Sequence, residues 1–131
     1  MNSLDVFVLP SLAEGTPNSI VEAMAHGVPV IASEVGGIPD MLDAHSGIIV
    51  PPGDTTALAD AMLMLARDPQ LRVDMGIAAR ERYQKFFAPN VVMPLMLKTY
   101  ESVAANGNGL KEKIADNSHH HPWALARAEI A

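Results

Sequence analysis

The chain is 131 residues long, and its 15 acidic and 9 basic side chains give a formal net charge of −6. This length fits one ordinary domain, and an apolar fraction of 49% excludes a wholly disordered protein. Because the chain has no cysteine, it can form no disulfide, thiolate nucleophile or cysteine-ligated metal centre. The sequence shows neither a secretory signal nor the ~20 consecutive apolar residues of a membrane span. By elimination we expect a protein of the cytoplasm or of the cytoplasmic face of a membrane.

Charge is unevenly distributed along the chain. Residues 1–66 contain eight carboxylates and no lysine or arginine, and the first basic residue is Arg67. Nucleic-acid binding needs clustered cations that neutralise phosphates, so we expect no nucleic-acid partner for this part. An anionic ligand bound here must therefore be held by main-chain N–H groups or by cations from another segment.

Three short apolar runs predict strands. Residues 4–9 and 28–32 have the composition of strands buried on both faces, which is typical of parallel sheets. Residues 47–50 precede a Pro-Pro-Gly turn and predict a third strand. Pro29 has no N–H to donate, so pairing of the second strand is expected to begin after it.

A helix is predicted between the first two strands. Thr16 supplies an N-cap side chain, Pro17 fits the first helical position and Gly27 fits a C-terminal cap. These signals predict a helix over residues 17–26. A strand, a helix and a second strand within about thirty residues form a βαβ unit, whose right-handed crossover makes the strands parallel.

Three more helices are predicted after the third strand. Asp54 or Thr55 caps the first, an Asp-Pro pair at 68–69 separates it from the second, and the third spans residues 89–105 with Pro94 as a kink. The expected inward residues are Leu58, Met62, Leu65 and Ala66 in the first helix and Leu71, Met75, Ala78 and Ala79 in the second; the expected solvated residues are Arg80, Glu81 and Arg82.

Three strands are fewer than the five or six of a doubly wound α/β sheet, and they leave an edge unpaired. The sequence therefore predicts an α/β fold that is the second half of a nucleotide-binding domain. We expect residues 1–105 to form this partial Rossmann-like domain and residues 106–131 to form a tail that is flexible or holds a short helix. An isolated chain of this kind is expected to be marginally stable or associated, for example as a homo-oligomer.

Residues 11–27 form the candidate ligand-binding segment. They follow the carboxyl end of a strand and open a helix, which is where open α/β sheets bind ligands. Helix N-termini present unpaired N–H groups and a partial positive charge, so this segment is able to hold a phosphate without a nearby cation. The amides concerned belong to Thr16, Asn18, Ser19 and Ile20.

Two carboxylates flank this helix start. Glu14 lies in the preceding loop, and Glu22 is the sixth residue of the predicted helix, ~7–8 Å along its axis. A carboxylate at that distance is placed to accept both ribose hydroxyls of a nucleotide, while Glu14 is placed to accept hydroxyls of the group beyond the phosphate. Two solvated carboxylates, or the acid and base of a glycosidase, are the alternative interpretations.

Other features carry weaker signals. The glycines at 36 and 37 favour a plain loop over a close approach to a ligand, and His26 is expected to cap the helix end. His119, His120 and His121 predict adventitious metal binding or no role. No dinucleotide-binding or P-loop motif is present, and neither a metal site nor a cofactor is expected.

The span from Asp5 to Phe87, which includes GTPNSIVEAMAHGVPVIAS and GGIPDML, closely resembles the carboxyl-terminal domain of GT-B glycosyltransferases of the retaining family 4 type, also called glycosyl transferases group 1. The resemblance implies that Glu14 approaches the transferred sugar as the catalytic carboxylate and that Glu22 binds the ribose. It also implies a UDP-, GDP- or ADP-sugar donor and no divalent metal. The residues that it assigns to the diphosphate cradle are Gly15, Thr16, Pro17, Asn18, Ser19 and Ile20.

Two parts of a full family member are missing from this sequence: the acceptor-binding amino-terminal domain and an upstream Arg and Lys pair that neutralises the leaving group. Such electrostatic stabilisation is a large catalytic contribution, so the isolated chain is predicted to be nearly inactive. The favoured hypothesis is a transferase fragment that works when completed by the missing part. A noncatalytic nucleotide or nucleotide-sugar binding module and a protein-interaction module are the alternatives. Base, sugar and acceptor are left open.

Overall fold

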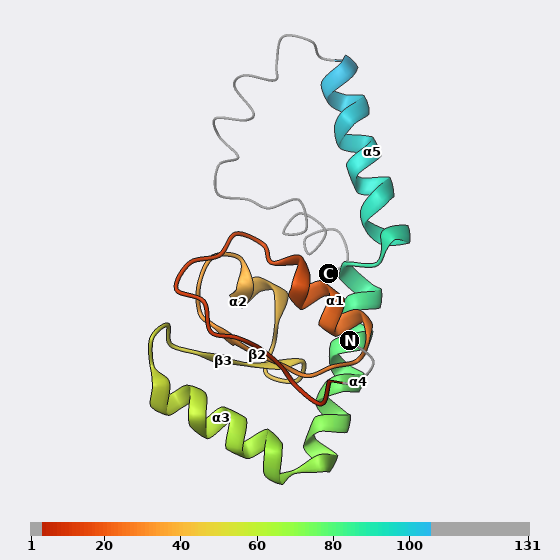
Figure 1. The fold of residues 1–131 in the computed structure, drawn as a ribbon. Coiled ribbons are helices and arrows are strands. Elements are labelled where there is room, and N and C mark those ends of the chain that lie inside the picture. Colours follow the sequence, from red (N-terminus) through yellow and green to blue (C-terminus); the bar gives the residue numbers. More distant parts are fainter. Residues whose placement is uncertain (1–3, 106–131) are drawn as a thin grey trace. The chain divides into compact units, whose positions relative to one another are not determined.

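A three-stranded parallel sheet lies at the centre of the first part of the chain. The computed structural model describes residues 4–105, so the predicted tail lies outside the described residues. The strands β1 (Phe7–Leu9), β2 (Val30–Ser33) and β3 (Gly47–Val50) lie side by side in the order β1-β2-β3 (Figure 1). All neighbours are parallel, with Val8 beside Ile31 and Ile31 beside Ile48. The predicted α/β class with three parallel strands is confirmed.

Pro29 sets the start of the β1–β2 ladder. Its carbonyl accepts the Phe7 N–H at 2.9 Å, and β2 begins one residue later, as its missing N–H predicts. The first strand is shorter than the predicted 4–9, because a ladder cannot extend upstream along a partner that has no donor at Pro29. The other two strands match their predicted ranges to within two residues at either end.

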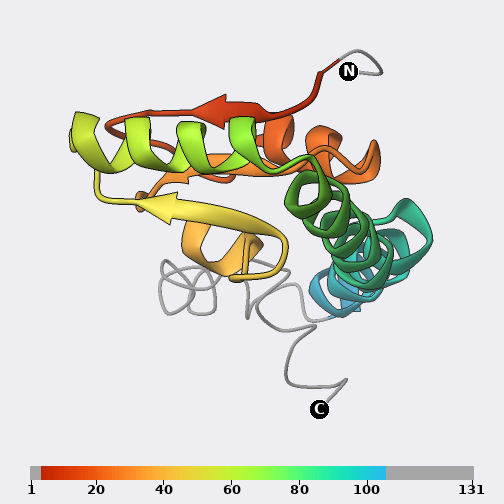
Figure 2. The same cartoon turned by 90° about the horizontal axis from the view of Figure 1, so that it is seen from below.

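Helices cover both faces of the sheet. The helices α1 (Asn18–Ala25) and α2 (Ile38–Met41) lie on one face, and α3 (Thr55–Arg67) lies on the other (Figure 1). Figure 2 shows α3 running along the sheet over the space between β1 and β3. The short α2 was not expected from the sequence.

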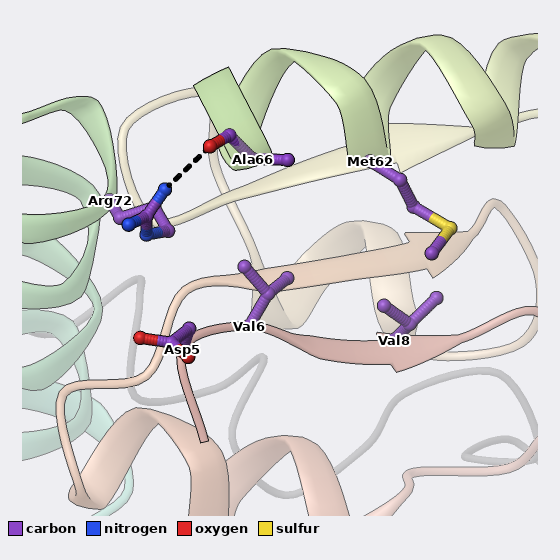
Figure 3. A pocket seen from close by; sticks show the side chains of 6 residues that line it. All are labelled: Asp5, Val6, Val8, Met62, Ala66 and Arg72. Atoms are coloured by element: carbon purple, nitrogen blue, oxygen red, sulfur yellow. Dashed lines mark hydrogen bonds between the residues drawn. The ribbon is translucent and has the colours of Figure 1, made fainter. Parts of the chain in front are cut away.

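The core on the α3 side consists of residues from the sheet and two helices. Its buried members are Ile31, Val50, Ala61, Leu65 and Met75. The predicted inward position of Leu65 is confirmed, but Met62 is 47% exposed and Ala66 is also exposed. Both lie toward β1, which is the outermost strand of the sheet among residues 4–105 (Figure 3).

The helix α4 (Pro69–Phe86) follows directly on α3. Asp54 caps α3 by accepting the Ala57 N–H at 2.9 Å, and Asp68 accepts the Leu71 N–H at the same distance. Both aspartates therefore begin helices as predicted. Met75 and Ala79 are buried on α4, whereas Leu71 and Ala78 are half-buried.

The chain divides into two compact units, one up to Gln84 and one from Lys85 onward. In the second unit, α5 spans Pro89–Ala105 and contains Pro94, as predicted. No helix among residues 4–105 has the length and apolarity needed to cross a membrane.

Candidate functional site

The loops that follow β1 and β2 meet at the carboxyl edge of the sheet. The N–H of Gly37 donates to the carbonyl of Gly15 at 2.8 Å. Gly36 has φ +54°, and a Cβ atom there would lie 2.0 Å from the carbonyl oxygen of Glu14. The two glycines thus form a close contact between two loops, which the interpretation as a plain loop missed. Adjacent glycines after a buried strand were the available signal.

Glu14 is half-buried in the loop after β1. Ser11 Oγ donates to Glu14 Oε1 at 2.6 Å, which fixes the direction of the carboxylate. No residue in the described part of the chain donates to the other oxygen, Oε2. Sequence reasoning missed Ser11, although a serine three residues before a glutamate is within hydrogen-bonding reach of it.

The start of α1 differs from the prediction by one residue. Pro17 is the N-cap, buried and extended with φ −72° and ψ 114°, and no side chain caps the helix. The predicted roles of Thr16 as N-cap and Pro17 as first helical residue are therefore wrong. An extended ψ at Pro17 cannot continue as a helical turn, so the helix begins at Asn18.

At this helix start, two main-chain N–H groups have no acceptor in the described part of the chain. The Ile20 N–H donates to the Pro17 carbonyl at 3.1 Å and is thereby engaged within the helix start. The N–H groups of Asn18 and Ser19 precede the first intrahelical hydrogen bonds and have no acceptor within residues 4–105. These two amides are therefore the ones that are open to an anion.

Glu22 lies on the exposed side of α1 as its fifth residue, ~6 Å along the helix axis from Asn18. Its carboxylate makes no hydrogen bond or ion pair with any described residue. Its carbonyl accepts from His26 Nδ1 at 2.8 Å, so His26 caps the helix end as predicted. Gly27 then leaves the helix with φ +68°, in the left-handed region that glycine tolerates.

Arg82 of α4 has a different environment from the predicted one. Its side chain is only 11% exposed, and its guanidinium makes three contacts with the end of α2 and the residues after it. Nε donates to the Met41 carbonyl at 2.7 Å, Nη2 to the Asp40 carbonyl at 3.0 Å, and Nη1 to Asp43 Oδ2 at 2.8 Å. The prediction that Arg82 is solvated is wrong, because the carbonyls at a helix end attract a cation that can reach them.

Asp43 forms a small network of its own. Its Oδ1 accepts from the Ser46 N–H and hydroxyl, both at 2.9 Å, and from the His45 N–H at 3.1 Å. Burial raises the pKa of Asp43, but the hydrogen bonds from Ser46 and the charge of Arg82 outweigh it and hold the pKa below the ordinary value of 3.8. Asp43 therefore stays ionised near neutral pH.

A separate cavity of about 350 Å³ lies on the α3 side of the sheet, beside β1 (Figure 3). Arg72 lies at one end of it and donates to the Ala66 carbonyl at 3.2 Å. None of the predicted site residues lines this cavity, whose lining residues are Asp5, Val6, Val8, Met62, Ala66 and Arg72. Residues 4–105 contain no group of three or more potential metal ligands, and His119, His120 and His121 lie outside the described residues.

The sequence profile of the family described as glycosyl transferases group 1 matches residues 1–68, just over half of the chain. The chain belongs to this family. The amylovoran biosynthesis glycosyltransferase AmsK of Erwinia amylovora is 34% identical over 111 residues, which cover 79% of this chain and 27% of AmsK.

Solved structures of glycosyltransferases have the same fold. The sucrose-phosphate synthase from Thermosynechococcus elongatus is 37% identical with a TM-score of 0.73, covering 77% of this chain and 26% of that chain. Anabaena Alr3699/HepE, solved in complex with UDP and with UDP-glucose, is 24% identical with the same TM-score, covering 77% of this chain and 28% of that chain. The three-stranded core is thus a fragment of a GT-B fold, and the chain spans less than a third of the length of these relatives.

Proposed function

We propose that this chain is the nucleotide-sugar-binding part of a retaining glycosyltransferase. The observation that carries the proposal is the arrangement around the start of α1. The unpaired N–H groups of Asn18 and Ser19 follow a loop that presents Glu14, and Glu22 lies about one helical turn further along. This arrangement offers hydroxyl acceptors on both sides of an anion-binding helix start.

Each group is assigned a part of the ligand. The amides of Asn18 and Ser19 hold the diphosphate of the donor. Glu22 accepts the ribose hydroxyls, and Glu14, directed by Ser11, faces the transferred sugar. The described residues from 4 to 66 contain no lysine or arginine, so the donors available in this part of the site are uncharged main-chain and side-chain groups.

Transfer needs the rest of the protein. A departing nucleoside diphosphate carries concentrated negative charge, and cations that stabilise it lower the barrier. Arg72 and Arg82 are held by main-chain carbonyls in other parts of the fold. We therefore propose that the isolated chain is nearly inactive and that transfer requires the additional part present in the longer relatives.

A noncatalytic nucleotide-binding or protein-interaction module is the second candidate. The observation that favours it is the same lack of cations beside the helix start, combined with the unpaired outer edge of β1 among the described strands. Such an edge is able to pair with a strand of another polypeptide segment or of a second copy of the chain. Under either proposal the protein acts in the cytoplasm or at the cytoplasmic face of a membrane.

Thermal-shift titration of the purified chain tests donor binding. UDP, GDP, ADP and their glucose conjugates are added in turn, because a ligand that binds only the folded state raises the melting temperature. The proposal is supported if ligands with one base raise the melting temperature and Glu22→Ala abolishes that rise. Glu81→Ala, on the exposed side of α4, is the control and should preserve it. No shift with any of these ligands from a cooperatively melting protein would overturn donor binding by this chain.

A further inference from the structure

The short helix α2 is held at both of its ends. At its start, the Gly37 N–H is bonded to the Gly15 carbonyl in the loop after β1. At its end, the guanidinium of Arg82 holds the carbonyls of Asp40 and Met41. The N–H groups of these same two residues donate to the Gly37 carbonyl, both at 3.3 Å.

These bonds form an unbroken path from α4 to the proposed sugar side of the site. It runs from Arg82 through Asp40 and Met41 to Gly37, and from there to Gly15. A helix of four residues has no stability of its own, since helix nucleation is unfavourable. Its geometry therefore depends on the groups that hold its two ends.

We propose that Arg82 is a positioning residue that fixes the turn at Glu14 and Gly15 through α2. This inference rests on the proposed function, in which Glu14 faces the transferred sugar. Arg82 does not contact that turn itself. It holds the carbonyls of Asp40 and Met41, whose N–H groups bond to the Gly37 carbonyl. The Gly37 N–H then bonds to the Gly15 carbonyl, and Gly36 packs against the main chain of Glu14, so the turn is held in place.

Loss of Arg82 is expected to affect the two halves of the donor unequally. The N–H groups of Asn18 and Ser19 belong to α1, whose first turn is closed by the bond from Ile20 to Pro17 and does not depend on α2. Diphosphate binding is therefore expected to persist when α2 loosens. The contact with the sugar depends on Glu14, so the preference for UDP-glucose over UDP is expected to fall.

The test compares Arg82→Gln with Arg80→Gln, which removes the same charge from an exposed position on the same helix. Amide hydrogen exchange by NMR is followed at Gly37 and at Ile31 in the buried strand β2, and the dissociation constants of UDP and UDP-glucose are measured by calorimetry. Arg82→Gln is expected to speed exchange at Gly37 relative to Ile31 and to reduce the affinity ratio of UDP-glucose to UDP by about three- to tenfold.

Two further readouts separate positioning from a general loss of stability. A general loss speeds exchange at Gly37 and Ile31 equally and weakens both ligands equally, and that result would overturn the proposal. Arg82→Lys keeps a cation but lacks the planar fork, and it is expected to restore part of the Gly37 protection. Unchanged exchange at Gly37 in Arg82→Gln would also overturn it. If the unmodified chain binds neither ligand, donor binding fails, and the Gly37 exchange alone decides the positioning role.

Discussion

Gly36 packs directly on the main chain of Glu14, so closely that a Cβ atom would lie 2.0 Å from the Glu14 carbonyl oxygen. The contact joins the loops after β1 and β2, and the adjacent bond from Gly37 to Gly15 reinforces it. The main chain of the residue proposed to face the sugar is therefore positioned by a glycine on a different loop, and Ser11 directs its carboxylate. This relationship links the stability of the fold to the geometry of the site.

Gly36→Ala is expected to destabilise the protein by about 2 kcal/mol or more. The added methyl group meets main-chain atoms that cannot rotate away, and the left-handed φ of +54° is strained for alanine. Urea unfolding measures the loss. Gly15→Ala is the matched control, because nothing lies within 4 Å of a Cβ atom built there, and its unfolding free energy is expected to change far less. Equal effects of the two substitutions would contradict the proposed contact.

The sequence predicted the strands and the long helices because their signals are local. Three kinds of feature act on their immediate neighbours and have the predicted effect. They are the proline at position 29, the aspartate caps at positions 54 and 68, and the apolar runs. The candidate site depends on contacts between loops that are distant in sequence, such as Gly37 with Gly15. Such pairings need the three-dimensional arrangement of the strands and leave no periodic pattern.

At Arg82 and Met62 the solvent exposure predicted from the sequence is wrong. A run of charged residues on a helix predicts solvent exposure, but the carbonyls at the end of α2 lie within reach of Arg82. An apolar residue at helical spacing predicts burial, but Met62 lies beside β1, the outermost strand of the sheet among the described residues, and is 47% exposed. Helical periodicity specifies a face of the helix and does not specify how wide the surface opposite that face is.

Gly76→Ala is expected to destabilise the protein, although alanine is the better helix former by about 1 kcal/mol. Gly76 is buried on α4 and faces the turn after α1, where a Cβ atom would lie 2.2 Å from the Gly27 carbonyl oxygen. The steric conflict with a main-chain atom exceeds the gain in helix propensity. Urea unfolding decides the sign, and a more stable Gly76→Ala protein would show that α4 does not pack this closely on Gly27.

Asp43 is expected to contribute to stability in a pH-dependent way. Its pKa in the folded state lies below 3.8, so its contribution is present above the pKa of the unfolded chain and is lost as the pH falls through the folded-state pKa. The difference in unfolding free energy between the unmodified protein and Asp43→Asn should stay constant from about pH 7 to about pH 5 and shrink below about pH 4. Asp60→Asn, at an exposed position on α3, removes one carboxylate elsewhere and is the matched control for the change in net charge. A difference that grows on acidification would contradict the lowered pKa.

Proline substitutions in β1 test whether its outer edge is free. The Phe7 N–H points toward β2, where it bonds to the Pro29 carbonyl, so the N–H of Val8 points away from β2 by the alternation of strand geometry. Proline at either position imposes the same restriction on φ, but only Phe7→Pro removes a hydrogen bond of the ladder. Phe7→Pro is therefore expected to lower the melting temperature more than Val8→Pro, by roughly 4–8 °C for each kcal/mol of difference.

The comparison also bears on how the chain associates. If two copies pair through β1, the Val8 N–H is part of an intermolecular ladder, and Val8→Pro then lowers the melting temperature as much as Phe7→Pro and shifts the protein to a smaller species in size-exclusion chromatography. If the edge is free in the isolated chain, Val8→Pro leaves the elution volume unchanged. In that case the edge remains available for the additional part present in the longer glycosyltransferases, and Val8→Pro should block its addition by removing the donor that a new strand needs.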